Sequence, residues 1–189
     1  MARGDIRLFH ETFHAYRYLK SIIYGGLDGI VTTFAVVAGV AGASLNSNII
    51  LILGLANLIG DGISMAIGDY LSSKAYIEYH ENDNKNNKSN KKVNRKELIP
   101  FKNALATFLS FVIFGFIPLI AFVLSYFINI PNILFISLLL SAIALFTLGS
   151  LKYRITGKHW LRSGFEMVLV GSMAAGAAYL VGKIVAGIV

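Results

Sequence analysis

The chain has 189 residues, of which 56% are hydrophobic and 14% are charged, and its mean hydropathy is +0.65. A soluble domain carries about a quarter charged residues, so these figures exclude an ordinary cytosolic globule and a disordered chain. The chain has no cysteine, which excludes disulfides, thiolate metal sites, iron–sulfur clusters and cysteine nucleophiles. We therefore expect an integral membrane protein, in which the net charge of +7 needs its own explanation.

Residues 1–20 predict a short amphipathic helix at the membrane surface. Acidic and histidine side chains interrupt this segment, so it does not resemble a cleaved signal peptide. It contains the sequence HETFH, which matches the H-E-x-x-H motif of zinc metalloproteases and places His10 and His14 on one helical face. A membrane zinc protease is therefore one alternative. Incidental histidines on a surface helix, or weak metal capture by them, are the others, because no third ligand follows at a typical spacing.

Long stretches without charge predict the membrane spans, since each span needs about 20 apolar residues. No basic residue occurs between Lys20 and Lys74, and no charge of either sign occurs from 103 to 151. We expect five transmembrane helices, over 24–45, 48–74, 101–127, 132–152 and 163–186. Pro118 should kink the third of them. The fold class is therefore all-α, with residues 21–189 forming a single transport domain.

The basic residues predict the orientation of these helices. They fall in the N-terminal segment, in the connection between the second and third helices, and in that between the fourth and fifth. Five alternating spans put all three segments on one side, and 16 of the 17 basic residues lie there. We expect a cytosolic N-terminus, an external C-terminus and a flexible cytosolic loop over 81–96, which is rich in Asn and Lys. Attraction to anionic lipid explains the basic surplus better than nucleic-acid binding, because the largest cluster has no interleaved aromatic residues.

Four carboxylates fall within the expected spans: Asp28, Asp61, Asp69 and Glu166. An acid at mid-membrane costs at least a few kcal/mol unless it is paired, hydrated or protonated. Away from their ends, the surrounding spans offer no Lys or Arg, so we do not expect ion pairs. These acids therefore predict a pathway for a cation or a proton.

The acids of the second helix belong to a stripe of ligand-type residues. Asn57, Asp61, Met65 and Asp69 recur every four residues, which places them on one side of a helix. At about 1.5 Å per residue, Asp28 and Met65 lie at the same depth, and Asp61 lies deepest. A carboxylate with a thioether suits Fe²⁺, Mn²⁺, Co²⁺ or Zn²⁺ better than Mg²⁺ or Na⁺.

Each candidate ligand also has a structural alternative. Met65 can serve in apolar packing, and Asp69 and Glu166 can extend to the cytosolic interface. Small residues recur on the first and fifth helices, and we interpret them as close helix contacts or a dimer seam. They include Ala35, Gly39, Ala43, Gly171, Ala175, Ala178 and Gly182.

These residues resemble the vacuolar iron transporter family. The matching sequences are DGIVTTFAVVAG at 28–39, ANLIGDGISMAIGDYLS at 56–72, and the region from LGSLK at 148–152 to SGFEM at 163–167. The resemblance implies five helices per subunit, a homodimer, and export of divalent iron or manganese from the cytosol in exchange for protons. It also implies a pathway at the dimer interface, between the first and second helices, with Asp28 and Met65 as its intramembrane Asp and Met.

The chain departs from the family pattern in two places. Vacuolar members extend the second helix into a Glu-rich cytosolic domain, whereas this chain has only the Asn/Lys loop. Glu78, His80, Glu81 and Asp83 at its edge are either a reduced entrance site or a solvated helix end. Some members also carry Glu where this chain has Asn57, and here Asp61 supplies an acid one turn deeper.

We therefore expect a transporter of Fe²⁺, Mn²⁺ or both, and not an enzyme. The metal is the cargo, with no resident cofactor, and the partners are protons, the lipid bilayer and a second copy of the chain. A non-transporting membrane metal sensor remains an alternative, beside the protease. The absence of a targeting segment favours a prokaryotic cell membrane.

Overall fold

The structure is a computed structural model that describes residues 3–87, 100–153 and 159–188, with the backbone alone for 3–18 and 80–87. These residues form helices and no strand. The helices are α1 (Arg3–Gly42), α2 (Ser47–Asn87), α3 (Pro100–Gly115), α4 (Ile117–Leu124), α5 (Ile133–Leu151) and α7 (Trp160–Ala186).

The helices confirm the expected all-α membrane architecture. In the described residues, α5, α7 and the apolar parts of α1 and α2 are each long and apolar enough to cross a bilayer. Helices α3 and α4, bent by 44° where they meet, pass the same test only as a pair, so the described residues contain four candidate spans, or five if this pair is one broken span. The expected kink is confirmed, because the break falls at Phe116 and Pro118 lies in the first turn of α4. The chain is thus a multi-pass membrane protein.

Helices α1 and α2 are longer than the sequence predicts. They have 40 and 41 residues, or roughly 60 Å each at 1.5 Å per residue, about twice the hydrocarbon thickness of a bilayer. Helix α1 runs unbroken from Arg3, so the segment over 1–20 is continuous with the first span, and its place at the membrane surface stays a prediction. Helix α2 likewise includes 81–87 of the expected loop, while 88–96 lie outside the described residues.

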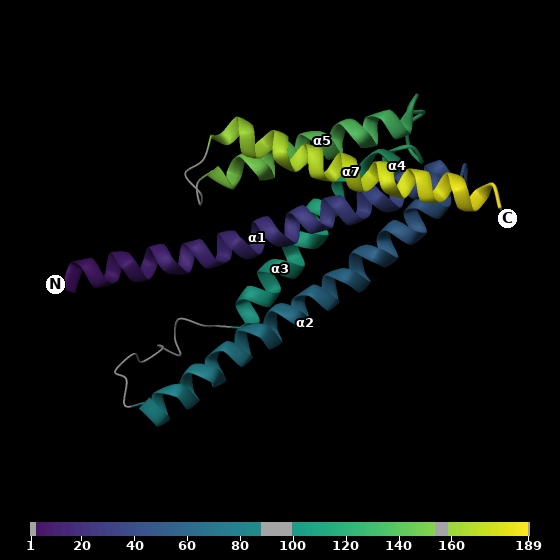
Figure 1. The fold of residues 1–189 in the computed structure, drawn as a ribbon. Coiled ribbons are helices and arrows are strands. Elements are labelled where there is room, and N and C mark those ends of the chain that lie inside the picture. The colour runs from purple at the N-terminus through teal and green to yellow at the C-terminus, as the bar shows by residue number, and fades with distance from the viewer. Residues whose placement is uncertain (1–2, 88–99, 154–158, 189) are drawn as a thin grey trace.

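The arrangement of the helices brings the basic segments to one end of the molecule (Figure 1). The start of α1, the end of α2, the start of α3, the end of α5 and the start of α7 all lie there. Helices α1 and α2 meet near their connection and diverge toward this end, where α3 lies between them and contacts both. Lys183, in the last turn of α7, lies at the opposite end.

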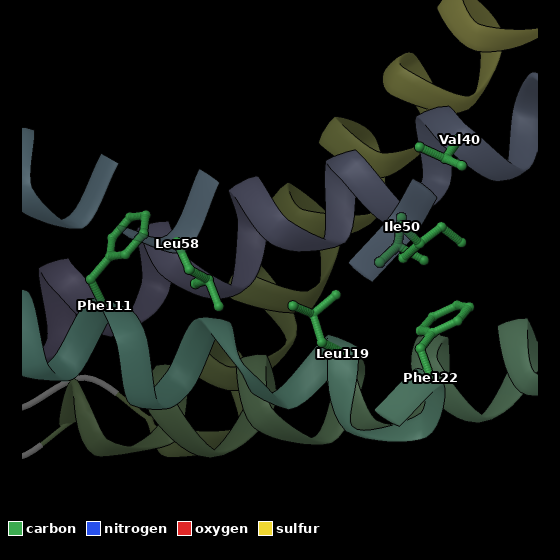
Figure 2. Close-up of a cluster of buried hydrophobic side chains, with 7 residues drawn as sticks. Val40, Ile50, Leu58, Phe111, Leu119 and Phe122 are labelled. Atoms are coloured by element: carbon green, nitrogen blue, oxygen red, sulfur yellow. The ribbon is translucent and has the colours of Figure 1, made fainter. Parts of the chain in front are cut away.

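Two buried clusters hold α1 in the middle of the bundle. The first joins α1, α2, α3 and α4 (Figure 2) and consists of Val37, Val40, Ile50, Leu58, Phe111, Leu119 and Phe122. The second joins α1 to α5 and α7 and consists of Ile30, Ala144, Leu145, Leu148 and Met167. Burial on α2 is one-sided: only 22% of its most apolar window is buried.

The small residues of α1 and α7 allow the two backbones to touch. A Cβ on Gly182 would meet the carbonyl oxygen of Gly39, and one on Gly42 would meet that of Tyr179. Gly39 itself packs against Ala178. These positions therefore serve close packing within one chain, which is one of the two roles that the sequence predicts for them.

Candidate functional site

The structure brings together two acids from the first two helices. Asp28 of α1 is half-buried, and Asp61 of α2 is exposed. The two carboxylates are close enough for their charges to interact. No basic residue occurs between Lys20 and Lys74. Helices α1 and α2 therefore bring two carboxyl groups together without a basic residue from this stretch.

The core fixes the backbone next to this acid pair. Gly29, which follows Asp28, lies so close to Phe111 of α3 that a Cβ would meet its carbonyl oxygen. On α2, Leu58 is fully buried and approaches Gly115 of α3. Helix α3 thus holds both α1 and α2 at the level of the acids. Thr32 donates a hydrogen bond of 2.8 Å to the backbone carbonyl of Asp28, so this contact leaves the carboxylate free.

Met65 and Asp69 line a cavity of about 450 Å³ between α1, α2 and α3, which we call the Asp69 cavity. Its wall includes Ser21 and Tyr24 of α1 and Thr107 of α3. The sequence predicts Met65 at the depth of Asp28. In the structure Met65 shares this cavity with residues about one turn before Asp28, and the acid near Asp28 is Asp61. The equal depth of Asp28 and Met65 thus stays a prediction.

Asp69 is held by hydroxyl groups from three helices. Its Oδ2 accepts a 2.7 Å hydrogen bond from Thr107 and a 3.5 Å one from Ser21, and its Oδ1 accepts a 3.5 Å bond from Ser73. Thr107 and Ser73 are buried. The carboxylate therefore has a fixed orientation between α1, α2 and α3, instead of extending freely to the interface.

Asn57 lies at the other end of the stripe. It is half-buried, and its Nδ2 is a buried atom with no hydrogen-bond partner. It lines a second hollow, of about 460 Å³, together with Val36 and Gly39 of α1. An unpartnered amide at this place is available to water or to a passing ligand.

Glu166 has a basic partner, which corrects the expectation that the acids of the spans are unpaired. Its Oε2 lies 3.8 Å from Nζ of Lys152. The expectation left out basic residues at the ends of the spans, where Lys152 lies, and the end of α5 and the start of α7 lie together at one end of the molecule. The pair places Glu166 on the opposite side of α1 from the α2 stripe, away from the other candidates.

The stripe side of α2 is left open by the residues that the structure describes. Asp61 and Ser64 are exposed, and a Cβ added to Gly60 or Gly68 would meet no atom within 4 Å. Among the described residues no group of three His, Cys, Asp or Glu side chains could hold a metal ion. The described part of one chain thus supplies only part of a coordination shell.

Sequence reasoning missed the contribution of α3. Asn103, Thr107 and Ser110 are buried polar residues of α3, which carries no charge after Lys102, and the first two line the Asp69 cavity. Their spacing of four and then three residues is the signal that could have revealed a polar face turned toward a partner. Ser110 donates a hydrogen bond to the carbonyl of Ile22, so this face joins α3 to α1.

The remaining candidates lie at the ends of α1 and α2. Glu78 is exposed and lies 3.8 Å from Lys74, as expected of a solvated helix end. The side chains of His80, Glu81 and Asp83 lie outside the described residues. So do those of His10 and His14, whose backbone belongs to α1.

Comparisons with known proteins agree on one family. A sequence model of the VIT family matches residues 19–99 and 86–183. The chain is 30% identical to the vacuolar iron transporter of Plasmodium berghei, across 87% of this chain and 81% of that protein. It is 27% identical to vacuolar iron transporter 1 of Arabidopsis thaliana, across 94% and 91%. A shorter match to the vacuolar iron transporter of Toxoplasma gondii reaches 50% identity over 64 residues, which is 34% of this chain and 21% of that protein.

The alignments also show where the relatives differ from this chain. Those with the Plasmodium and Arabidopsis proteins run to 224 and 233 positions, more than the chain's 189 residues, so these relatives contain residues without a counterpart here. The two segments of the family match overlap at 86–99, where the sequence predicts a shortened connection between the second and third helices. These relatives are eukaryotic and therefore do not support the expectation of a prokaryotic membrane. The family match covers most of the sequence, and the chain belongs to the VIT family.

Proposed function

We propose that this protein exports Fe²⁺, Mn²⁺ or both from the cytosol across a membrane in exchange for protons. The names of the relatives support iron as cargo. The observation that carries the proposal is the acid pair, Asp28 and Asp61, on two apolar helices. Two carboxylates whose charges interact attract a divalent cation, and an unoccupied pair is costly to keep charged in the membrane.

The same pair offers a physical route to proton exchange. A carboxylate must be deprotonated to bind a metal, so metal binding releases protons and protonation releases metal. We propose that protons from an acidic outer side reach Asp28 and Asp61, displace the metal outward, and leave on the cytosolic side. Met65, one turn from Asp61 on the same stripe, supplies a soft thioether ligand that favours Fe²⁺ and Mn²⁺ over Mg²⁺.

We propose further that the working unit is a homodimer whose seam covers the stripe of α2. The exposed Asp61, with Gly60, Ser64 and Gly68 around it, would otherwise face lipid, at a cost of about 3 kcal/mol for an acid near the helix centre. A second copy would also complete the coordination shell that the described part of one chain lacks.

The test is metal uptake into proteoliposomes with an acidic interior. The wild-type protein should accumulate Fe²⁺ or Mn²⁺ only while the proton gradient lasts. Asp28→Asn and Met65→Ala should each reduce the uptake rate about tenfold or more, because each removes a metal ligand. Met173→Ala is the matched control, since Met173 of α7 is 67% exposed and lines neither the Asp69 cavity nor the hollow beside Asn57.

Native uptake rates in both Asp28→Asn and Met65→Ala would contradict the assignment of these residues as ligands of the transported metal. The same assay addresses the alternatives: a metal sensor would bind the ion without moving it. For the protease, Glu11→Ala should leave uptake unchanged, and the loss of a peptidase activity in that variant would contradict our inference that the chain is not an enzyme.

A further inference from the structure

We propose that the Asp69 cavity is a separate binding site for a hydrated divalent cation, which the ion occupies before it reaches the Asp28–Asp61 pair. This inference rests on the proposed function, because it assigns a first stop on the same route. It makes α3 part of the route, although α3 carries no charge between Asn103 and Gly115.

The size of the cavity suits an ion that keeps its water. Its volume of about 450 Å³ exceeds the roughly 180 Å³ that six water molecules occupy in the liquid. Asp69 is the only carboxylate among the described residues that line it. One carboxylate cannot replace the hydration shell of a divalent cation, so the ion would retain most of its waters here.

The wall of the cavity is built from fixed polar groups. Thr107 and Asn103 of α3 are 1% and 7% exposed, and both line the cavity. The 2.7 Å hydrogen bond from Thr107 fixes Oδ2 of Asp69, whereas Oδ1 accepts a single bond, of 3.5 Å from Ser73, within the described part of the chain. An oriented carboxylate with one weakly bonded oxygen, set among hydroxyl and amide groups, matches the preference of a hydrated cation for oxygen ligands.

Lys20 lies in the same wall and opposes this attraction. It is exposed and lines the cavity, and it is the last basic residue before the first span. Its ammonium group lowers the negative potential that Asp69 creates. Lys20 therefore weakens cation binding and favours release of the ion toward the Asp28–Asp61 pair.

The test uses the absence of cysteine in this chain. Ser72 is exposed and lines the cavity, so Ser72→Cys provides a single thiol there. In the full-length protein in nanodiscs, Mn²⁺ should slow the labelling of this thiol by a maleimide, and Mn²⁺ has little preference for thiolate ligands. Ser47→Cys is the matched control: it lies at the other end of α2, and its labelling should not respond to Mn²⁺.

Second substitutions in the Ser72→Cys protein identify the groups that bind the ion. Asp69→Asn should raise the Mn²⁺ concentration for half-protection about tenfold or more, because the only charged ligand is lost. Thr107→Val, which keeps the shape but removes the hydroxyl, should raise it about threefold or more. Lys20→Met should lower it about threefold. Asp28→Asn should leave protection unchanged while metal uptake is lost.

Protection by Mn²⁺ that Asp69→Asn does not change, or the absence of any protection, would overturn the inference. Equal loss of protection in Asp28→Asn and Asp69→Asn would also overturn it, because the ion would then occupy one shared site. Each of these results leaves the proposed transport standing if Asp28→Asn abolishes proton-driven uptake. A failure of uptake in the wild type would count against the proposed function itself.

Discussion

At the scale of single residues, the shape of the site depends on places where a side chain is absent. Gly29 lies against the carbonyl of Phe111, and this contact brings α1 to α3 beside Asp28. A methyl group has no space there, because the atom that it would meet belongs to the backbone and cannot rotate away. The neighbouring acid therefore owes its position to a glycine that takes no part in chemistry.

Gly29→Ala should accordingly destabilise the protein by about 1–3 kcal/mol, the usual cost of overpacking. It should also reduce uptake, since Asp28 is displaced with the backbone. Gly176→Ala is the control, because a Cβ on Gly176 of α7 would meet no atom within 4 Å. Unfolding in SDS, followed by circular dichroism, measures both variants. Equal stability of the two would show that α1 and α3 do not touch at Gly29.

Single residues also show the limit of sequence reasoning. The spacing of Asn57, Asp61, Met65 and Asp69 correctly places them along one side of α2, because helical periodicity is a local property. The partners of these residues are not local. Thr107 is 38 positions from Asp69, and Lys152 approaches Glu166 only because α5 and α7 lie together. Sequence therefore predicts which residues share a face, while the packing of helices decides what that face meets.

At the scale of elements, the broken span α3–α4 is tied to its neighbour. Pro118 cannot donate a backbone hydrogen bond, and its carbonyl accepts a 2.6 Å bond from the hydroxyl of Ser137 on α5. Ser137 is fully buried. This hydrogen bond joins α5 to α4 at the bend, so that α5 packs against the broken span.

Ser137→Ala should cost about 1 kcal/mol of stability, the value of one buried hydrogen bond, without a change in fold. Ser172→Ala, on the exposed side of α7, is the control, and it should leave the free energy of unfolding nearly unchanged. Thermal unfolding in detergent gives the difference. A Ser137→Ala protein as stable as the Ser172→Ala protein would contradict a role for this bond.

The lengths of the elements were harder to predict than their number. Charge-free stretches reveal the spans because the bilayer excludes charge, and Pro118 reveals the bend. The ends of α1 and α2 are different, since no Gly or Pro occurs in 5–24 or 69–87 to stop a helix once it leaves the membrane. Hydropathy marks where a helix meets water, and it does not mark where the helix ends.

At the scale of the whole molecule, the open side of α2 predicts an assembly. The proposed homodimer should place Ser64, exposed on the stripe side, next to the second copy. In this cysteine-free chain, Ser64→Cys should form a disulfide-linked dimer in membranes under mild oxidation, seen on a non-reducing gel. Ser172→Cys should stay monomeric. A disulfide-linked dimer of Ser172→Cys but not of Ser64→Cys would instead place the dimer interface at α7.

Helices α1 and α2 are both unbroken over roughly 60 Å, whereas the span between them is interrupted at Phe116. A displacement at one end of an unbroken helix is transmitted along it, so a tilt of α2 near Asn87 would move Asp61 and Met65 as well. The break in α3–α4 is the place where the bundle can bend to accommodate such a tilt. A partner that binds the end of α2 near Asn87 would therefore act on the proposed metal pathway from a distance.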